Sequence, residues 1–228
     1  GILNIAFWNT MKYFALLILK TFLAYGIAYF LYKKILGYRF FRTVFFLPSI
    51  ISPIILVAIF KNIIEVYGPL WTLWKALFGV ELPDFLGRPE TATNVILIYT
   101  FWIGFGNSFL IFVGTMNRIP DDVIEAGVLD GVNGWQEFWR IIVPLGWETL
   151  STLLLISLTQ IFMSTGPILY FNGGQHNTTT LAYWIFDQVR FGSYNYPAAV
   201  GLFFTILAIP IVFGCRWLMN RTNANISY

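Results

Sequence analysis

Long apolar runs separated by short polar segments dominate the sequence. Five runs are long enough to cross a membrane as helices, which needs roughly 20 mainly apolar residues. They cover about residues 9–32, 43–63, 93–116, 141–165 and 197–219. In lipid each backbone polar group needs a partner within its own segment, so these runs must be helical. The pattern therefore predicts an all-α membrane protein with five spans.

Two of the intervening segments are too apolar for simple loops. In residues 65–92, five large apolar side chains recur at helical spacing and predict a short helix at the membrane interface, where tryptophan is favoured: Leu70, Trp71, Trp74, Leu77 and Phe78. In residues 166–196, Gly173 and Gly174 predict a turn. The stretch 178–191 then predicts an amphipathic helix that re-enters the protein.

Composition supports the membrane interpretation. Hydrophobic residues make up 57% of the chain and charged residues only 11%, whereas soluble domains carry about 25% charged residues. The net charge of +3 is too small to indicate a nucleic-acid partner. The single Cys215 excludes an intramolecular disulfide and is expected to be a small packed side chain. The surroundings are therefore largely lipid.

The distribution of basic residues predicts the orientation, because cytoplasmic loops are richer in lysine and arginine. Counting only the loops and span ends, one side carries twice as many basic residues as the other. That side has Lys33, Lys34, Arg39, Arg42, Arg118, Arg140, Arg216 and Arg221, and the opposite side has Lys61, Lys75, Arg88 and Arg190. The richer side is predicted to be cytoplasmic. The C-terminus and residues 118–145 then lie inside, and Gly1 lies outside.

Residues 118–145 form a polar segment between two apolar runs, with the sequence EAGVLDGVNGWQEFWRIIVP at 125–144. Asp122 followed by Glu125 predicts a helix start with a capping box. Val123, Ala126 and Leu129 would share one face of this helix. Gly131 and Gly134 end it, and a side chain at Gly131 is expected to clash within the turn. Such a helix either docks into a groove of another protein or rests on lipid headgroups. Its acidic character favours docking, since surface-bound helices are usually basic.

At this point the sequence resembles the EAA loop of ABC importer permeases. Glu125, Ala126, Gly131, Ile141 and Pro144 match the motif in identity and spacing, while Gly127 and Val143 replace its second alanine and its leucine. The stretches FFLPSIISPIILVAIF, IPDDVIEAGVLDGV and NGGQHNTTTLAYWIFDQVRF resemble the carbohydrate branch, notably maltose-type importers. Gln175 stands where that branch usually has proline. Members of the family usually have one further N-terminal span, which we expect to precede this chain.

The resemblance implies a type I ABC importer transmembrane domain over residues 1–228. It further implies a second homologous permease subunit, two cytoplasmic ABC ATPases and an extracellular solute-binding protein that delivers a sugar or oligosaccharide. The location is the bacterial inner membrane. No GxxxxGK[ST] sequence occurs, so we expect no cofactor or enzymatic activity in this chain, with ATP and Mg²⁺ held by the partner ATPases. Five loop residues are expected to contact an ATPase: Glu125, Ala126, Gly127, Asp130 and Gly131.

The resemblance also places a substrate path in the third and fourth spans. The matching positions are Thr100, Ile103, Gly104, Asn107, Gln160, Ile161 and Ser164. Polar groups at membrane depth are costly and therefore candidates for function, and amides and hydroxyls suit the hydroxyl groups of a sugar. Alternatively, the same groups form hydrogen bonds between helices and hold the helices together. Two alternatives to sugar import remain: a permease for another solute, or a secondary transporter, which would show inverted repeats or intramembrane ion pairs.

Overall fold

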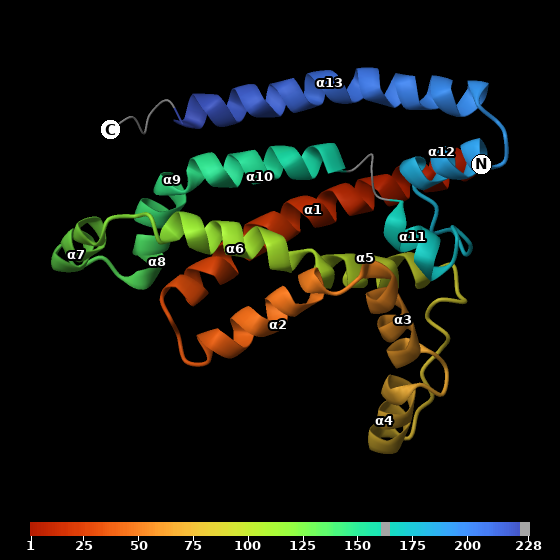
Figure 1. Ribbon diagram of the computed structural model, residues 1–228, viewed down its shortest axis with the longest axis horizontal. Coiled ribbons are helices and arrows are strands. Elements are labelled where there is room, and N and C mark those ends of the chain that lie inside the picture. Colours follow the sequence, from red (N-terminus) through yellow and green to blue (C-terminus); the bar gives the residue numbers. More distant parts are fainter. Residues whose placement is uncertain (161–164, 224–228) are drawn as a thin grey trace. The chain divides into compact units, whose positions relative to one another are not determined.

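The computed structural model describes residues 1–160 and 165–223, and these form helices without strands. Figure 1 shows their order along the chain. The helices are α1 Ile2–Tyr32, α2 Tyr38–Ile50, α3 Pro53–Ile64, α4 Pro69–Phe78, α5 Ala92–Ile103, α6 Phe105–Met116, α7 Asp121–Leu129, α8 Gly134–Glu137, the π-helix η1 Phe138–Ile142, α9 Val143–Leu145, α10 Trp147–Gln160, α11 Gly166–Phe171, α12 Leu181–Arg190 and α13 Asn195–Asn223. The all-α prediction is confirmed.

The chain forms two compact units. Unit 1 contains residues 1–16, 48–103 and 160–205, and unit 2 contains residues 17–47, 104–159 and those from 206 onward. Each of the five predicted apolar runs therefore contains residues of both units. The unit boundary between Ile103 and Gly104 coincides with the break between α5 and α6.

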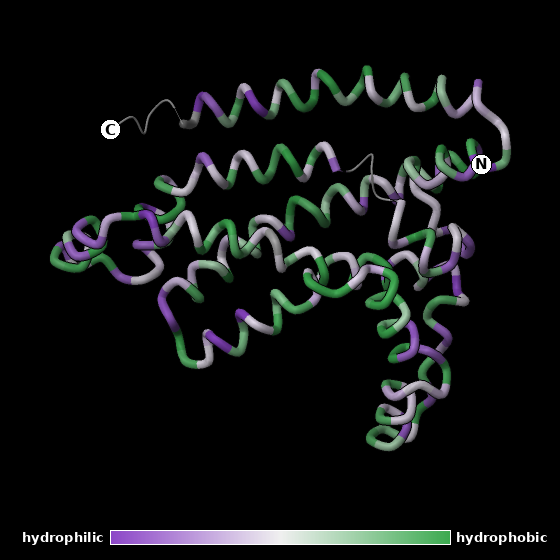
Figure 2. Tube along the Cα trace, viewed as in Figure 1, coloured by the Kyte–Doolittle hydropathy of each residue, from purple (hydrophilic) through white to green (hydrophobic). Residues whose placement is uncertain are grey.

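Length and hydropathy identify membrane spans close to those predicted. Within the described residues, four helical stretches qualify: Ile2–Tyr32, Pro53–Phe78, Ala92–Met116 and Asn195–Arg221. A fifth arises if Gly134–Leu145 and Trp147–Gln160, which are bent by 71° at Gly146, count as one span. Figure 2 shows the hydrophobic character of these helices. The predicted number of spans is thus confirmed only when the bent pair is counted.

The second predicted span was wrong in its extent. Residues 43–63 are divided, because α2 ends at Ile50 and α3 begins at Pro53. Between them Ser52 is extended, with ψ of 132°, as expected for a residue that precedes proline. Pro48, by contrast, lies inside α2 without ending it.

The core of unit 1 is built by aromatic and aliphatic side chains from five helices. The rings of Tyr99 and Phe171 meet edge to face with centroids 4.9 Å apart, an arrangement that adds to the free energy of simple burial. The full cluster is Tyr13, Leu56, Val57, Ile96, Tyr99, Ile168, Phe171 and Tyr183. This packing joins α1, α3 and α5 to the helices α11 and α12 of the segment 166–196.

The first helix begins seven residues before the predicted span, at Ile2. Its early part includes two polar residues that are buried, Asn9 and Thr10. The Asn9 amide donates to the carbonyl oxygens of Asn177 at 2.6 Å and Thr179 at 3.0 Å, and the Leu181 N–H donates to the Thr10 hydroxyl at 3.0 Å. These hydrogen bonds satisfy polar groups that would otherwise be costly to bury. They also attach the start of α1 to the segment before α12.

Both predicted short helices are present, as α4 and α12, although α4 falls within the candidate span Pro53–Phe78. Gly173 and Gly174 form the predicted turn, with φ of 61° and 77°. The second helix starts later than predicted, at Leu181, because the Thr180 hydroxyl caps it by accepting the Tyr183 N–H. Thr178 is consequently buried ahead of the helix.

Unit 2 is held together by contacts between its long helices. The indole N–H of Trp147, at the start of α10, donates to the Met219 carbonyl of α13 at 3.2 Å. The hydroxyls of Thr115 on α6 and Thr149 on α10 lie 3.1 Å apart. Along α13 many apolar side chains are exposed, which fits a lipid-facing or partner-facing span. Examples are Leu202, Phe203, Ile206, Phe213, Trp217 and Leu218.

Candidate functional site

The segment 118–145 forms a short helix, a tight turn and a second helical stretch. Helix α7 begins after Pro120, whose φ of −59° and ψ of 137° place it at the N-cap without a side-chain cap bond. The predicted capping box of Asp122 and Glu125 was therefore wrong. Asp121 and Asp122 instead occupy the first turn, where carboxylates interact favourably with the helix dipole.

Helix α7 ends in a Schellman motif centred on Gly131. The Val132 N–H donates to the Gly127 carbonyl at 3.0 Å, and the Gly131 N–H donates to the Val128 carbonyl at 3.0 Å. Gly131 has φ of +75°, a left-handed conformation that glycine adopts without penalty. A Cβ at Gly131 would meet no atom within 4 Å. The predicted turn is confirmed, but the expected clash is wrong, because glycine is required here by backbone conformation.

Two positions of the segment that resembles the EAA loop, Gly127 and Ile141, lie against each other. A Cβ added to Gly127 would lie 2.8 Å from Cδ1 of Ile141, which is closer than real Cβ contacts. Gly127 is the buried position of α7. The absence of a side chain at Gly127 therefore allows α7 to approach the segment that leads back to the membrane, and Ile141 forms the opposing surface.

The second helical stretch starts with a capping box that sequence analysis missed. The Asn133 side chain accepts the Gln136 N–H at 2.9 Å, and the Gln136 side chain accepts the Asn133 N–H at 3.1 Å. The signal was present as asparagine followed three residues later by glutamine. Asn133 thus fixes where the chain leaves the turn and becomes helical again.

Replacing Asn133 with alanine is expected to lower the free energy of unfolding by about 1 kcal/mol, the usual cost of losing such a cap. Serine or aspartate at this position should retain most of the stability, because either accepts the same N–H. The thermal unfolding midpoint of the purified protein measures the difference. Equal midpoints for Asn133→Ala and Asn133→Ser would show that the cap does not stabilise the loop.

The remaining surface of α7 is exposed. Leu129 is 88% and Val128 is 62% exposed, and Glu125, Ala126 and Asp130 are also exposed. The face predicted for Val123, Ala126 and Leu129 is therefore exposed within the described chain. Large exposed apolar side chains beside carboxylates are typical of a surface that binds another protein.

The predicted substrate path is only partly described. Thr100 and Ile103 lie three residues apart on α5 and are half-buried, and the Thr100 hydroxyl donates to the Ile96 carbonyl at 2.8 Å. Gly104 occupies the break between α5 and α6. Gln160 is the exposed last residue of α10. Asn107 lies on α6, while Ile161 and Ser164 fall outside the described residues. The role of Asn107 and Gln160 in a substrate path stays a prediction.

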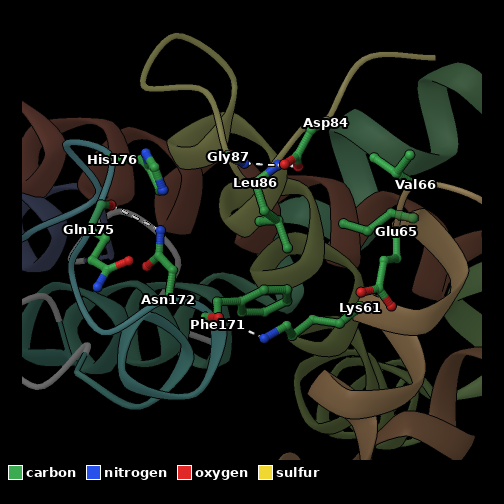
Figure 3. A pocket seen from close by; sticks show the side chains of 11 residues that line it. Lys61, Glu65, Val66, Asp84, Leu86, Gly87, Phe171, Asn172, Gln175 and His176 are labelled. Carbon is green, nitrogen blue, oxygen red and sulfur yellow. Dashed lines mark hydrogen bonds between the residues drawn. The ribbon is translucent and has the colours of Figure 1, made fainter. Parts of the chain in front are cut away.

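Unit 1 contains a cavity of about 380 Å³ that none of the predicted path residues lines. Figure 3 shows its polar side chains, which come from the end of the predicted second span and from the segments 65–92 and 166–196. The Lys61 ammonium donates to the Phe171 carbonyl at 2.9 Å, and Asn172 donates to the Gln175 carbonyl at 2.9 Å. Glu65, Asp84 and His176 complete the polar lining. Gln175, the departure from the family's usual proline, thus contributes to a polar hollow.

Comparison with known proteins agrees with this architecture. Residues 5–227 match the family described as binding-protein-dependent transport system inner membrane component. The maltose/maltodextrin transport system permease protein of Klebsiella aerogenes is 29% identical over 146 residues, covering 60% of this chain and 28% of the relative. That of Vibrio vulnificus strain YJ016 is 31% identical over 127 residues, covering 55% and 24%. The chain thus matches about a quarter of the length of these relatives.

Solved structures share the fold. A bacterial ABC transporter involved in the import of the acidic polysaccharide alginate has a chain that matches with a TM-score of 0.87 and 20% identity, covering 97% of this chain and 80% of that one. A complex of the alginate transporter with an alginate pentasaccharide-bound periplasmic protein matches with the same TM-score over 96% and 79%. The importer-type transmembrane fold and the multi-pass inner-membrane location predicted from sequence are confirmed. The chain belongs to the family of binding-protein-dependent transport system inner membrane components.

Proposed function

We propose that this chain is the permease subunit of an ATP-driven importer of a sugar or oligosaccharide. The observation that carries the proposal is the form of α7: a short acidic helix, exposed along most of its surface and ended at Gly131 by a Schellman turn. Such a helix presents a rigid protrusion that fits a groove on another protein. The match to a family of binding-protein-dependent transport components supports the same interpretation.

The coupling surface consists of Glu125, Ala126 and Asp130, with Gly127 and Gly131 fixing its shape. Glu125 and Asp130 are exposed acidic groups, so the complementary groove should be basic. In our proposal α7 of this chain docks into one cytoplasmic ATPase. The matching helix of a second homologous permease docks into the other ATPase. ATP and Mg²⁺ bind to those ATPases. Closure of the ATPase pair then moves α7. This movement switches the substrate path from inward-facing to outward-facing.

The sugar class rests on the relatives. They are permeases for maltose and maltodextrin, and the solved structures concern alginate import. One of those structures includes a periplasmic protein bound to an alginate pentasaccharide, which supports an extracellular solute-binding protein as a further partner. Hydroxyl and amide groups of the path suit carbohydrate hydroxyls.

Purification in mild detergent tests the proposed assembly. We expect the tagged chain to retain a second permease and an ATPase, and the mixture to hydrolyse ATP faster when a sugar-loaded binding protein is added. Retention of no ATPase, together with uptake driven by an ion gradient in whole cells, would instead support a secondary transporter. If the ATPase is retained but the binding protein carries an amino acid or a metal, the proposed importer stands and only the proposed solute class is wrong.

Substitution of Asn107 and Gln160 by leucine tests the substrate path. An apolar side chain cannot replace the hydrogen bonds offered to a passing sugar, so each variant should reduce uptake about tenfold, equivalent to about 1.4 kcal/mol. Assembly and basal ATP hydrolysis should persist. Thr205→Leu on α13 is the matched control, an exposed polar position in another span. Normal uptake combined with dissociation of the complex would show that both amides hold helices together.

A further inference from the structure

One face of α1 carries polar side chains at four-residue spacing. Tyr25 and Tyr29 lie within α1, and Lys33 follows its last residue. The Lys33 N–H still donates to the Tyr29 carbonyl at 3.0 Å, so the helical spacing continues to Lys33. Residues four apart lie on one helix face. The three side chains therefore project in the same direction at the predicted cytoplasmic end of α1.

All three side chains reach the stretch that follows the coupling turn. The Tyr25 hydroxyl donates to the Ile142 carbonyl at 2.6 Å, and the Tyr29 hydroxyl donates to the Gly134 carbonyl at 2.9 Å. The Lys33 ammonium lies 2.6 Å from a carboxylate oxygen of Glu137. We call Tyr25, Tyr29 and Lys33 the α1 clamp. The clamp contacts the start of α8 at Gly134, the end of α8 at Glu137 and the end of η1 at Ile142.

The contacts of the α1 clamp are partly shielded from solvent, with the Lys33 side chain 35% exposed. The Glu137 side chain is only 7% exposed, so its charge has few alternatives to the Lys33 ammonium. The Phe138 ring packs against Tyr25 and Tyr29, with centroids 5.9 Å and 5.1 Å away. A Cβ at Gly146 would lie 2.1 Å from the Tyr25 hydroxyl oxygen. The lack of a side chain at Gly146 thus leaves space for the Tyr25 hydroxyl.

The path from the coupling helix to the clamp is short and fully hydrogen-bonded. Only four residues separate Leu129 from Gly134, and both ends of this turn are fixed, by the Schellman bonds of Gly131 and by the Asn133 capping box. A movement of α7 cannot be absorbed in such a turn without breaking these bonds. The movement of α7 therefore displaces α8, and α1 moves with α8 because the clamp joins them. Helix α1 contributes residues to both units of the chain.

We propose that Tyr25, Tyr29 and Lys33 are positioning residues that make α1 follow the coupling helix when the ATPases close. This inference rests on the proposed function, because it assumes that α7 docks on an ATPase. It adds to that function the route by which movement enters the membrane helices. Glu137 serves as the anchor of the route.

Spin labels on the complete transporter complex test the inference without knowledge of the substrate. One label replaces Leu129, which is 88% exposed on α7, and the other replaces Phe30, which is 55% exposed on α1. The change in label mobility on addition of ATP with vanadate is recorded for each. In the native background both labels should respond. In the variant Tyr25→Phe/Tyr29→Phe/Lys33→Met the Leu129 label should still respond, while the Phe30 response falls at least fivefold.

Controls separate the possible outcomes. Lys34→Met removes the ammonium next to Lys33, which forms no salt bridge within the described chain, and it should leave both responses unchanged. Lys33→Glu alone should abolish the Phe30 response, and Glu137→Lys in the same chain should restore it, even if the triple variant fails to assemble. Equal Phe30 responses in the native protein and the clamp variant would overturn the role of the clamp but leave the proposed function intact. Absence of a Leu129 response in the native complex would overturn the proposed function.

Discussion

Glu125→Lys is expected to lower ATP-driven uptake by about tenfold or more. Glu125 is exposed on α7, so reversing its charge leaves the fold of this chain intact. In the complex, however, the new ammonium would face the basic groove that we propose for the ATPase, and like charges at an interface cost several kcal/mol. Each 1.4 kcal/mol corresponds to a factor of about ten. Uptake into membrane vesicles measures the loss.

Asp122→Lys is the matched control for this substitution. It introduces the same charge change on the same exposed helix, one turn nearer the start and outside the motif positions. Its uptake should remain within about twofold of the native protein, since the helix-dipole effect is worth only about 0.3–1 kcal/mol. Equal losses in both variants would mean that the overall charge of the loop matters and that Glu125 has no specific partner.

Gly131→Val is expected to disrupt coupling to a similar extent. The φ of +75° at this position is a conformation that costs a residue with a Cβ about 1–2 kcal/mol, and β-branched side chains adopt it least readily. The Schellman turn would open and α7 would lose its fixed direction. ATP hydrolysis by the assembled complex should continue, while the uptake per ATP hydrolysed falls about tenfold.

Gly131→Asn distinguishes backbone strain from crowding. Asparagine adopts positive φ more readily than other residues that have a Cβ, and the space around Gly131 is open. Its uptake should therefore lie close to the native value. If asparagine is as harmful as valine, the requirement for glycine at position 131 comes from contact with a partner and not from the backbone conformation of the turn.

Sequence alone predicted the parts of the site that depend on local rules. The glycine turn at Gly131 follows from spacing that is characteristic of the coupling loop, whereas the contact between Gly127 and Ile141 was not predicted. The start of α7 was misplaced because Asp122 and Glu125 fit a capping box, whereas Pro120 already defines the N-cap geometry. The capping box at Asn133 was equally visible in the sequence but lay next to a glycine pair that suggested only a turn.

The features that sequence could not predict depend on residues far apart in the chain. Hydropathy placed the start of the first span at residue 9, whereas α1 begins at Ile2. The structure shows Asn9 and Thr10 bonded to residues 177–181. The lack of a side chain at Gly146 likewise makes room for Tyr25, more than a hundred residues away. Local hydropathy contains no information about such pairs.

The most direct test of the central claim is uptake into proteoliposomes that contain the purified complex of permeases and ATPases. Labelled maltose, maltodextrin and an alginate oligosaccharide serve as probes, with ATP enclosed in the vesicles and the binding protein outside. We predict that at least one probe accumulates, and that omitting ATP or the binding protein stops accumulation. Accumulation of a probe without ATP, driven by a proton or sodium gradient, would contradict the claim.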